Sequence, residues 1–155
     1  MIRVAIAGAG GRMGRTLIEA VSCHEELRVG AACEQAKSGL IGVDAGSVIG
    51  LGAIDVKIVN NLNDVLPQFD VLIDFTTPDV TLKHIEICRL AKKQLVIGTT
   101  GFTDEQRNKI AETAKKIPIV LAPNMSVAMN LLFKLIEDSA KILKNDYDIE
   151  VFEAH

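Results

Sequence analysis

Short apolar runs alternate with stretches of helical periodicity along most of the chain. The runs of strand length cover residues 2–7, 28–33, 56–59, 71–74, 95–97 and 119–121. Because most of these runs are followed by a helical pattern, the order of elements predicts a parallel sheet with helices on both faces. We therefore expect an α/β fold built on a doubly wound parallel sheet.

Three segments carry the sequence signals of a helix start. Pro78 follows Thr77, which predicts a helix capped by Thr77 with proline at its first position. Thr103 and Gln106 have the spacing of a capping box, in which each side chain bonds the backbone N–H of the other residue. Ser126 is the expected cap of a further helix. Each start follows a predicted strand, as the alternation requires.

Two segments do not fit the alternation. Residues 35–55 contain five glycines and no clear period, so we expect either a functional flap or a short element hidden in a loop. After the last helix, residues 147–154 alternate apolar and polar side chains like a strand. We expect a dinucleotide-binding domain over residues 1–125. Residues 126–155 are expected to form the hinge, helix and first strand of a truncated α+β second domain.

Composition narrows the class of partner. The net charge is −3 and no basic run is present, which argues against a nucleic-acid surface. Three cysteines without a C-x-x-C pair disfavour a disulfide framework or a metal site and suit a reducing compartment. No apolar run approaches the roughly 18 residues of a membrane span, so we expect a cytoplasmic protein. We expect Cys23, Cys33 and Cys88 to be buried structural thiols, and His24 and His84 to be solvated without partners.

The most informative motif is the glycine-rich stretch after the first predicted strand. Gly8, Gly11 and Gly14 have the spacing G-x-x-G-x-x-G, whereas the strict dinucleotide motif needs a glycine where Met13 stands. A nucleoside triphosphate P-loop is excluded because Ala9 occupies the position of its first glycine. Strand, glycine turn and helix still bring backbone N–H groups toward a phosphate. The sequence therefore predicts a Rossmann-like dinucleotide site, with a ligand-free glycine turn as the alternative.

The glycines have distinct expected roles. We expect Gly8 to end the strand in a tight turn and Gly14 to let the helix pack close to the sheet. Between them the backbone is expected to contact the pyrophosphate of the dinucleotide. The residues assigned to this contact are Gly8, Ala9, Gly10, Gly11, Arg12 and Met13.

An acidic residue stands where a dinucleotide site needs one. Glu34 ends the second predicted strand, 20 residues after Gly14, and is expected to accept hydrogen bonds from the adenosine ribose. An exposed strand-end carboxylate is the alternative. Many sites that accept NADP carry an arginine beside or in place of the acid, whereas in this chain Gln35 follows Glu34. We therefore expect NADH to bind at least as well as NADPH, although Arg12 and Lys37 offset part of the repulsion between Glu34 and a 2′-phosphate.

Other candidate residues follow later strands. Ligands of doubly wound sheets lie at the carboxyl ends of the strands. Gly98, Thr99 and Thr100 follow the fifth predicted strand and are expected to line the nicotinamide side of the site. Phe75 follows the fourth strand and is expected to pack against the cofactor.

Several motifs in this order resemble the dihydrodipicolinate reductases (4-hydroxy-tetrahydrodipicolinate reductases). The matching segments span nearly the whole chain and are residues 4–14, Asp74-Phe75-Thr76, residues 97–102, residues 122–126 and Glu153-Ala154-His155. The resemblance implies a two-domain oxidoreductase of the diaminopimelate–lysine pathway that forms homotetramers. Such enzymes use NADH or NADPH to reduce a cyclic unsaturated dicarboxylate to tetrahydrodipicolinate.

The resemblance also assigns residues near the second domain. It implies that Ala122, Pro123, Asn124 and Met125 touch the nicotinamide ribose and carboxamide at a hinge. His155 matches the family histidine that donates a proton after hydride transfer. Of the family motif E-x-H-H-x-x-K-x-D-A-P-S-G-T, the chain carries only the first three positions. We therefore expect it to bind cofactor without turning over substrate, as a monomer or a dimer.

Two other functions agree with the same fold. A module that binds NAD(H) without chemistry would lack the catalytic histidine, lysine and dicarboxylate clamp. A different two-domain dehydrogenase, acting for example on aspartate or homoserine, would share the cofactor fold. The terminal Glu153-Ala154-His155 favours the reductase over the non-catalytic module. The same terminal motif and Gly98-Thr99-Thr100-Gly101 favour it over the other dehydrogenase.

Overall fold

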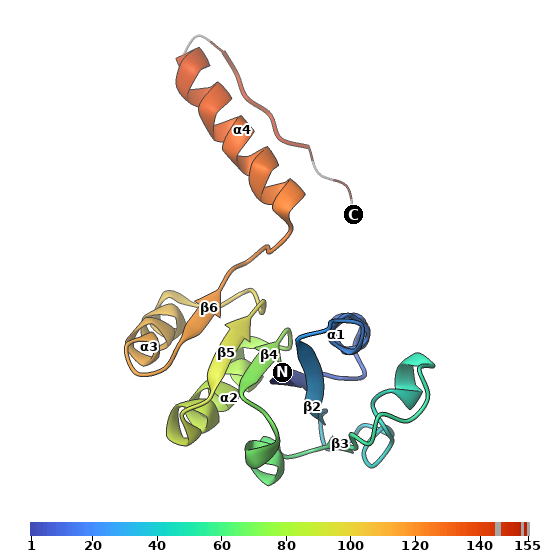
Figure 1. Cartoon of the computed structure of the whole chain (residues 1–155). Coiled ribbons are helices and arrows are strands. Elements are labelled where there is room, and N and C mark those ends of the chain that lie inside the picture. Colours follow the sequence, from blue (N-terminus) through green and yellow to red (C-terminus); the bar gives the residue numbers. More distant parts are fainter. Residues whose placement is uncertain (145–146, 153, 155) are drawn as a thin grey trace. The chain divides into compact units, whose positions relative to one another are not determined.

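The structure is a computed structural model that describes residues 1–144, 147–152 and 154 (Figure 1). Contacts within the chain divide it into two compact units, Met1–Pro123 and Asn124–His155. The first unit holds the sheet and the second holds one long helix.

The first unit contains a six-stranded sheet in the order β3-β2-β1-β4-β5-β6, in which every neighbouring pair is parallel. Its strands are β1 (Ile2–Ala7), β2 (Leu27–Cys33), β3 (Ile58–Val59), β4 (Val71–Asp74), β5 (Gln94–Ile97) and β6 (Ile119–Leu121). The chain starts in the middle of the sheet, builds β2 and β3 on one side, and then returns to build β4, β5 and β6 on the other. This order confirms the Rossmann-like doubly wound sheet that the sequence predicts.

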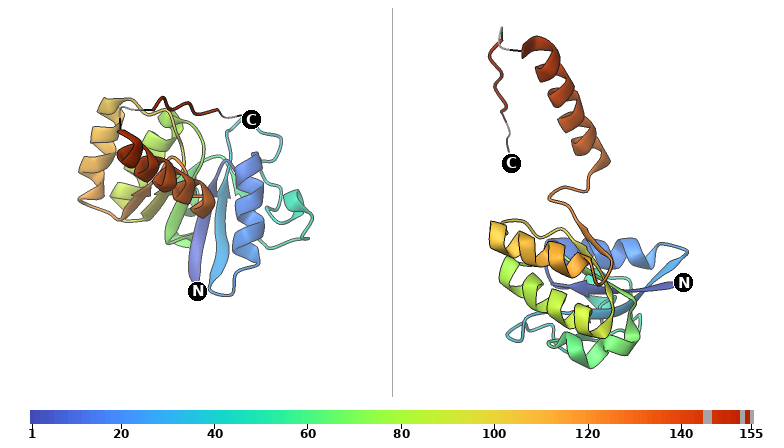
Figure 2. Two further views of the ribbon diagram at one scale, coloured as in Figure 1. Left: turned by 90° about the horizontal axis from the view of Figure 1, so that it is seen from above. Right: turned by 90° about the vertical axis from the view of Figure 1, so that its left-hand side faces the viewer.

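Helices cover both faces of this sheet (Figure 2). On one face, α1 (Arg12–Ser22) buries Ile18 and Val21 against Val4 and Ile6 of β1. On the other face lie α2 (Pro78–Ala91), α3 (Asp104–Ala114) and the 3₁₀ helix η2 (Leu62–Gln68). Alternate residues of β1 and of β4 therefore enter separate apolar cores, as expected for inner strands of a parallel sheet covered on both faces.

The predicted helix starts agree with the structure except in one detail. The Thr103–Gln106 capping box is present, with both reciprocal hydrogen bonds formed. Helix α2 begins at Pro78, but the side chain of Thr77 makes no capping hydrogen bond. Thr77 thus occupies the N-cap position as predicted, but the expected capping by its side chain was wrong.

The glycine-rich loop after β2 is organised around one carboxylate. Asp44 accepts four backbone hydrogen bonds, from Gly46 (2.9 Å), Ser47 (3.3 Å), Ile54 (3.0 Å) and Val56 (3.0 Å). The loop contains the 3₁₀ helix η1 (Ser47–Ile49), and a single antiparallel bridge joins Asp44 to Lys57. That bridge precedes β3, which is shorter than the predicted strand over residues 56–59. The loop therefore contains the short element that the sequence pattern left open.

Replacing Asp44 with alanine is expected to lower the free energy of unfolding by about 2–3 kcal/mol, because partly buried N–H groups lose their acceptor. Burial alone would raise the pKa of Asp44, but the four N–H donors bring it below its ordinary value. The stabilisation is therefore present above pH 4 or so and is lost as the pH falls through the lowered folded-state pKa. Urea unfolding at pH 7 and pH 3 measures both effects. The control Glu25→Ala, an exposed carboxylate before β2, should cost less than about 0.5 kcal/mol; an equal loss in both variants would contradict this account.

The second unit contains α4 (Val127–Leu143), whose first turn is capped by Ser126 accepting from the N–H of Met129. Leu131, Leu132 and Phe133 are exposed on this helix. Residues 147–152 and 154 form no strand, so the strand predicted over residues 147–154 was wrong. An isolated strand gains no ladder hydrogen bonds, and the described part of this unit offers no second strand to pair with it.

Candidate functional site

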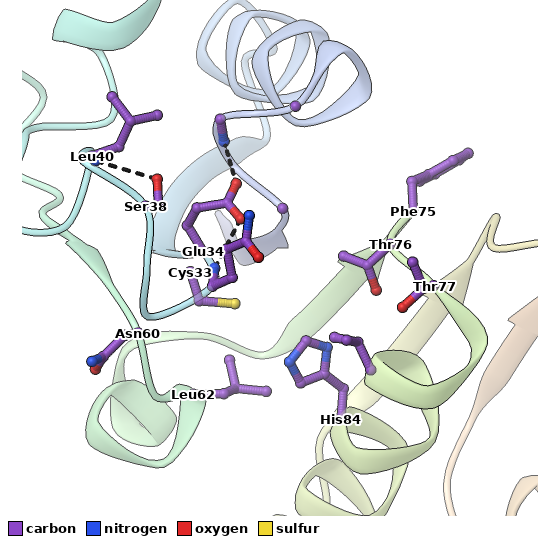
Figure 3. A pocket seen from close by; sticks show the side chains of 15 residues that line it. Cys33, Glu34, Ser38, Leu40, Asn60, Leu62, Phe75, Thr76, Thr77 and His84 are labelled. Carbon is purple, nitrogen blue, oxygen red and sulfur yellow. Dashed lines mark hydrogen bonds between the residues drawn. The ribbon is translucent and has the colours of Figure 1, made fainter.

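The carboxyl ends of β1, β2 and β4 border a cavity of about 670 Å³ (Figure 3). This is the point where the chain reverses its direction across the sheet, the usual ligand site in open α/β folds. Its lining residues are Gly8, Gly10, Gly11, Cys33, Glu34, Gln35, Ser38, Leu40, Asn60, Leu62, Phe75, Thr76, Thr77, Val80 and His84. All of them belong to the first unit.

The glycine turn needs its glycines for reasons visible in the backbone. Gly8 has φ +69°, a left-handed conformation that side chains disfavour. A Cβ at Gly14 would lie 2.1 Å from the carbonyl oxygen of Gly8, so α1 packs directly on the turn. The N–H of Gly11 donates to that same carbonyl oxygen (2.9 Å), which closes the turn. The structural roles expected of Gly8 and Gly14 are therefore present.

The N-terminus of α1 differs from that of α3. No side chain caps α1 and its first turn holds no acidic residue, whereas Thr103 caps α3 and two acids follow it. The first residue of α1 is Arg12, a cation where the helix dipole favours an anion. An anionic group placed at this end would be stabilised by the free N–H groups, the dipole and the guanidinium together.

Glu34 lies directly beside the glycine turn. Its half-buried carboxylate accepts from the N–H of Gly10 (2.9 Å) and of Gln35 (2.8 Å). A Cβ at Gly10 would come within 2.5 Å of a Leu40 methyl group and 3.2 Å of a Glu34 oxygen, so a larger residue would fit only if the Leu40 side chain shifted. The strand-end acid and the glycine turn, 24 residues apart in sequence, thus form one wall of the cavity.

The opposite wall contains Phe75, whose ring is half-buried and lines the cavity. A Cβ at Gly98 would lie only 2.0 Å from that ring. Gly98 therefore has a structural role that the sequence did not reveal, since it leaves room for Phe75. Thr99 is buried, with its hydroxyl 2.9 Å from that of Thr81, and neither it nor Thr100 lines the cavity.

The other predicted site residues lie elsewhere. Ala9 is buried beneath the glycine turn, and Arg12 and Met13 are exposed on α1 outside the cavity lining. Ala122 and Pro123 end the first unit after β6, and Asn124 and Met125 begin the second. His155, the predicted catalytic residue, is outside the described residues.

A hydrogen-bonded pair of side chains at the end of β4, Asp74 and His84, was missed by the sequence analysis. Asp74 is fully buried, and its Oδ2 lies 2.7 Å from Nδ1 of His84. Burial raises the pKa of Asp74, but the hydrogen bonds from His84 and Thr76 bring it below its ordinary value. The expectation that His84 is solvated without a partner was therefore wrong. A strand-end aspartate followed ten residues later by a histidine on the next helix was the available signal.

The cysteines differ in their surroundings. Cys33 and Cys88 are buried, and burial raises the pKa of each thiol to about 12. Thiols with such a pKa stay protonated and unreactive at neutral pH. Cys23 is exposed at the end of α1, so the expectation that all three are buried was wrong for Cys23. Within the described ranges, no helix is long and apolar enough to cross a membrane.

Comparison with known proteins identifies the family. Residues 2–125 match the family described as dihydrodipicolinate reductase, N-terminus. The 4-hydroxy-tetrahydrodipicolinate reductases of Geotalea uraniireducens and Hahella chejuensis share 53% and 50% sequence identity with this chain over all of its 155 residues. The chain covers 58% of the length of each of these curated relatives.

A solved structure agrees with this match. The dipicolinate-bound dihydrodipicolinate reductase of Paenisporosarcina sp. TG-14 is 31% identical, with a TM-score of 0.74 over 90% of this chain and 54% of that one. The glycine turn, the strand-end Glu34 and the doubly wound sheet thus occur in a chain that resembles these reductases over its whole length. The chain belongs to the dihydrodipicolinate reductase family, of which residues 2–125 form the N-terminal part.

Proposed function

We propose that the chain is the cofactor-binding part of a cytoplasmic reductase that converts 4-hydroxy-tetrahydrodipicolinate to tetrahydrodipicolinate with NADH or NADPH. The observation that carries this proposal is the glycine turn of β1, which leads into an uncapped helix and lies beside the Glu34 carboxylate. Family membership supplies the substrate. The buried thiols Cys33 and Cys88 suit a reducing compartment.

The residues of the glycine turn fit the cofactor. Gly8 and Gly10 line the cavity without side chains, so a pyrophosphate could approach their backbone, and Gly14 lets α1 pack on the turn. The N–H groups of the turn and of the first residues of α1 would hold the phosphates, and Glu34 would hold the adenosine ribose. When bound, the dinucleotide supplies the hydride. The chain's own groups bind and orient it.

The remaining assignments depend on the second domain. We place the domain boundary near residue 125, with residues 126–155 opening the substrate domain. Gly98, Thr99 and Thr100, and the hinge residues Ala122, Pro123, Asn124 and Met125, would serve the nicotinamide half of the cofactor. His155 would donate the proton that completes the reduction, since an imidazole exchanges protons near neutral pH. Assembly would be tetrameric through the second domain.

A chimaera tests the reductase activity. This chain would replace the 155 aligned residues of the Geotalea uraniireducens relative, which supplies the rest of the enzyme. NADH oxidation is then followed with 4-hydroxy-tetrahydrodipicolinate as substrate. The proposal predicts substrate-dependent oxidation within about tenfold of the relative's rate. A folded chimaera that binds NADH but never oxidises it would contradict the proposed activity.

We expect NADH to bind this chain at least as tightly as NADPH. A 2′-phosphate beside Glu34 would meet a like charge, which is worth about 4 kcal/mol at 4 Å in a medium of dielectric 20 and less when solvated. It would also remove a hydrogen bond from the ribose to a charged acceptor, roughly 1.5–3 kcal/mol. Calorimetric titration with both dinucleotides measures the preference. Binding of NADPH more than about tenfold tighter would overturn it.

A further inference from the structure

His84 lines the cavity, is hydrogen-bonded to the buried Asp74, and has no part in the pyrophosphate or ribose contacts proposed above. We infer that His84 recognises the adenine base of the bound dinucleotide, because its Nε2 accepts a hydrogen bond from the 6-amino group of the base. Asp74 is the positioning residue that orients the His84 ring. This inference rests on the proposed function, since it needs a dinucleotide in the cavity.

Asp74 fixes the orientation of the ring. Its Oδ1 accepts from the N–H of Thr76 (2.9 Å) and from the Thr76 hydroxyl (2.6 Å), so Oδ1 is committed as an acceptor. Its Oδ2 is left for Nδ1 of His84, at 2.7 Å. Asp74 is fully buried and its pKa lies below the ordinary value, so the carboxylate is ionised and can only accept. The proton of this hydrogen bond is therefore on Nδ1 of His84.

The tautomer follows from that proton. A neutral imidazole with its hydrogen on Nδ1 carries a lone pair on Nε2. The ring extends from α2 toward the cavity, and Nε2 has no hydrogen-bond partner among the described residues (Figure 3). The histidine side chain keeps 14% of its surface exposed, at this wall. When the imidazole is neutral, Nε2 is therefore an acceptor on the wall opposite Glu34.

The surroundings of that acceptor suit a purine. Leu40, Leu62 and Val80 line the same cavity and offer apolar surface to a flat ring. Glu34, which would hold the ribose, lies on the β2 side, so the base attached to that ribose would face the part of the cavity lined by Leu62, Val80 and His84. Of the groups on adenine, only the 6-amino group donates. An acceptor at Nε2 would therefore distinguish adenine from hypoxanthine, which carries a carbonyl at that position.

The test compares NADH with nicotinamide hypoxanthine dinucleotide in its reduced form, titrated calorimetrically at pH 8.5, a pH that favours neutral imidazole. The inference predicts that the chain binds NADH about five- to tenfold tighter than the hypoxanthine analogue, the worth of one hydrogen bond. His84→Ala should bring the ratio of the two affinities close to one. His24→Ala is the matched control: His24 is exposed, and the ratio should stay unchanged.

Asp74→Asn gives the sharper readout. The N–H of Thr76 holds the amide oxygen at the Oδ1 position, so the amide nitrogen would occupy the Oδ2 position and donate to Nδ1 of His84. The ring proton then moves to Nε2, which becomes a donor and should favour the hypoxanthine carbonyl, reversing the preference. An unchanged ratio of NADH to hypoxanthine-analogue affinity in folded Asp74→Asn overturns the tautomer assignment. An unchanged ratio in His84→Ala overturns the inference, even if Asp74→Asn does not fold.

The parent chain separates this inference from the proposed function. If it binds both dinucleotides equally, only this inference fails. If it binds neither, the proposed function fails as well.

Discussion

Replacing Gly14 with alanine is expected to lower the free energy of unfolding by about 2–3 kcal/mol and to weaken dinucleotide binding at least tenfold. The added Cβ would stand 2.1 Å from the carbonyl oxygen of Gly8 and 2.8 Å from the Cα of Ala9. Both obstacles are backbone atoms, so no rotamer change relieves the clash and α1 must move away from the turn. Alanine's better helix propensity, about 1 kcal/mol, offsets only part of the cost.

Gly39→Ala is the matched control for this substitution. A Cβ at Gly39 meets nothing within 4 Å, and its backbone is not left-handed. Its effect on stability should remain within about 0.5 kcal/mol. Urea unfolding and a calorimetric NADH titration measure both properties for each variant. Equal stability of the two variants would show that α1 does not pack on the turn as described.

Replacing Glu34 with glutamine is expected to reverse the cofactor preference. The variant keeps an acceptor for one of the two N–H groups, from Gly10 or Gln35, and loses the charge. NADH should bind about tenfold more weakly, because a hydrogen bond to a charged acceptor becomes a neutral one. NADPH should bind severalfold more tightly, because the like charge beside its 2′-phosphate is gone.

Glu26→Gln separates the local effect from the change in net charge. Glu26 is exposed at the amino end of β2, the end opposite Glu34, and the substitution removes the same unit of charge. Its NADH and NADPH affinities should match those of the parent chain within about twofold. A similar shift in both variants would assign the effect to overall charge instead of the ribose contact.

The elements that could be predicted are those whose signal is local. Six apolar runs identified six strands. The inner strand β1 shows the reason, because a strand buried on both faces reads as continuous hydrophobic sequence. The Thr103 capping box depends on residues three positions apart, and the turn at Gly8 on a backbone angle that glycine alone adopts easily. The position of Glu34 beside the glycine turn could be predicted because its spacing from the glycines is set by one crossover of the fold.

The features that the sequence analysis missed depend on contacts between residues distant in sequence, or on a pairing strand that the described residues do not supply. Asp44 orders its loop by accepting N–H groups up to 12 residues away, which leaves no periodic pattern. His84 meets Asp74 because α2 lies across the end of β4, and the need for Gly98 comes from the ring of Phe75. The alternation over residues 147–154 has the period of a strand, but pairing decides whether a strand forms.

Amide chemical shifts of the isotopically labelled chain during an NADH titration test the central claim most directly. The account predicts saturable shifts concentrated at Gly10, Gly11, Arg12, Met13 and Gln35. Arg28, near the amino end of β2 and away from the cavity, should show no comparable shift. Shifts that fail to saturate, or that cluster away from the glycine turn, would contradict a dinucleotide held by the turn and by Glu34.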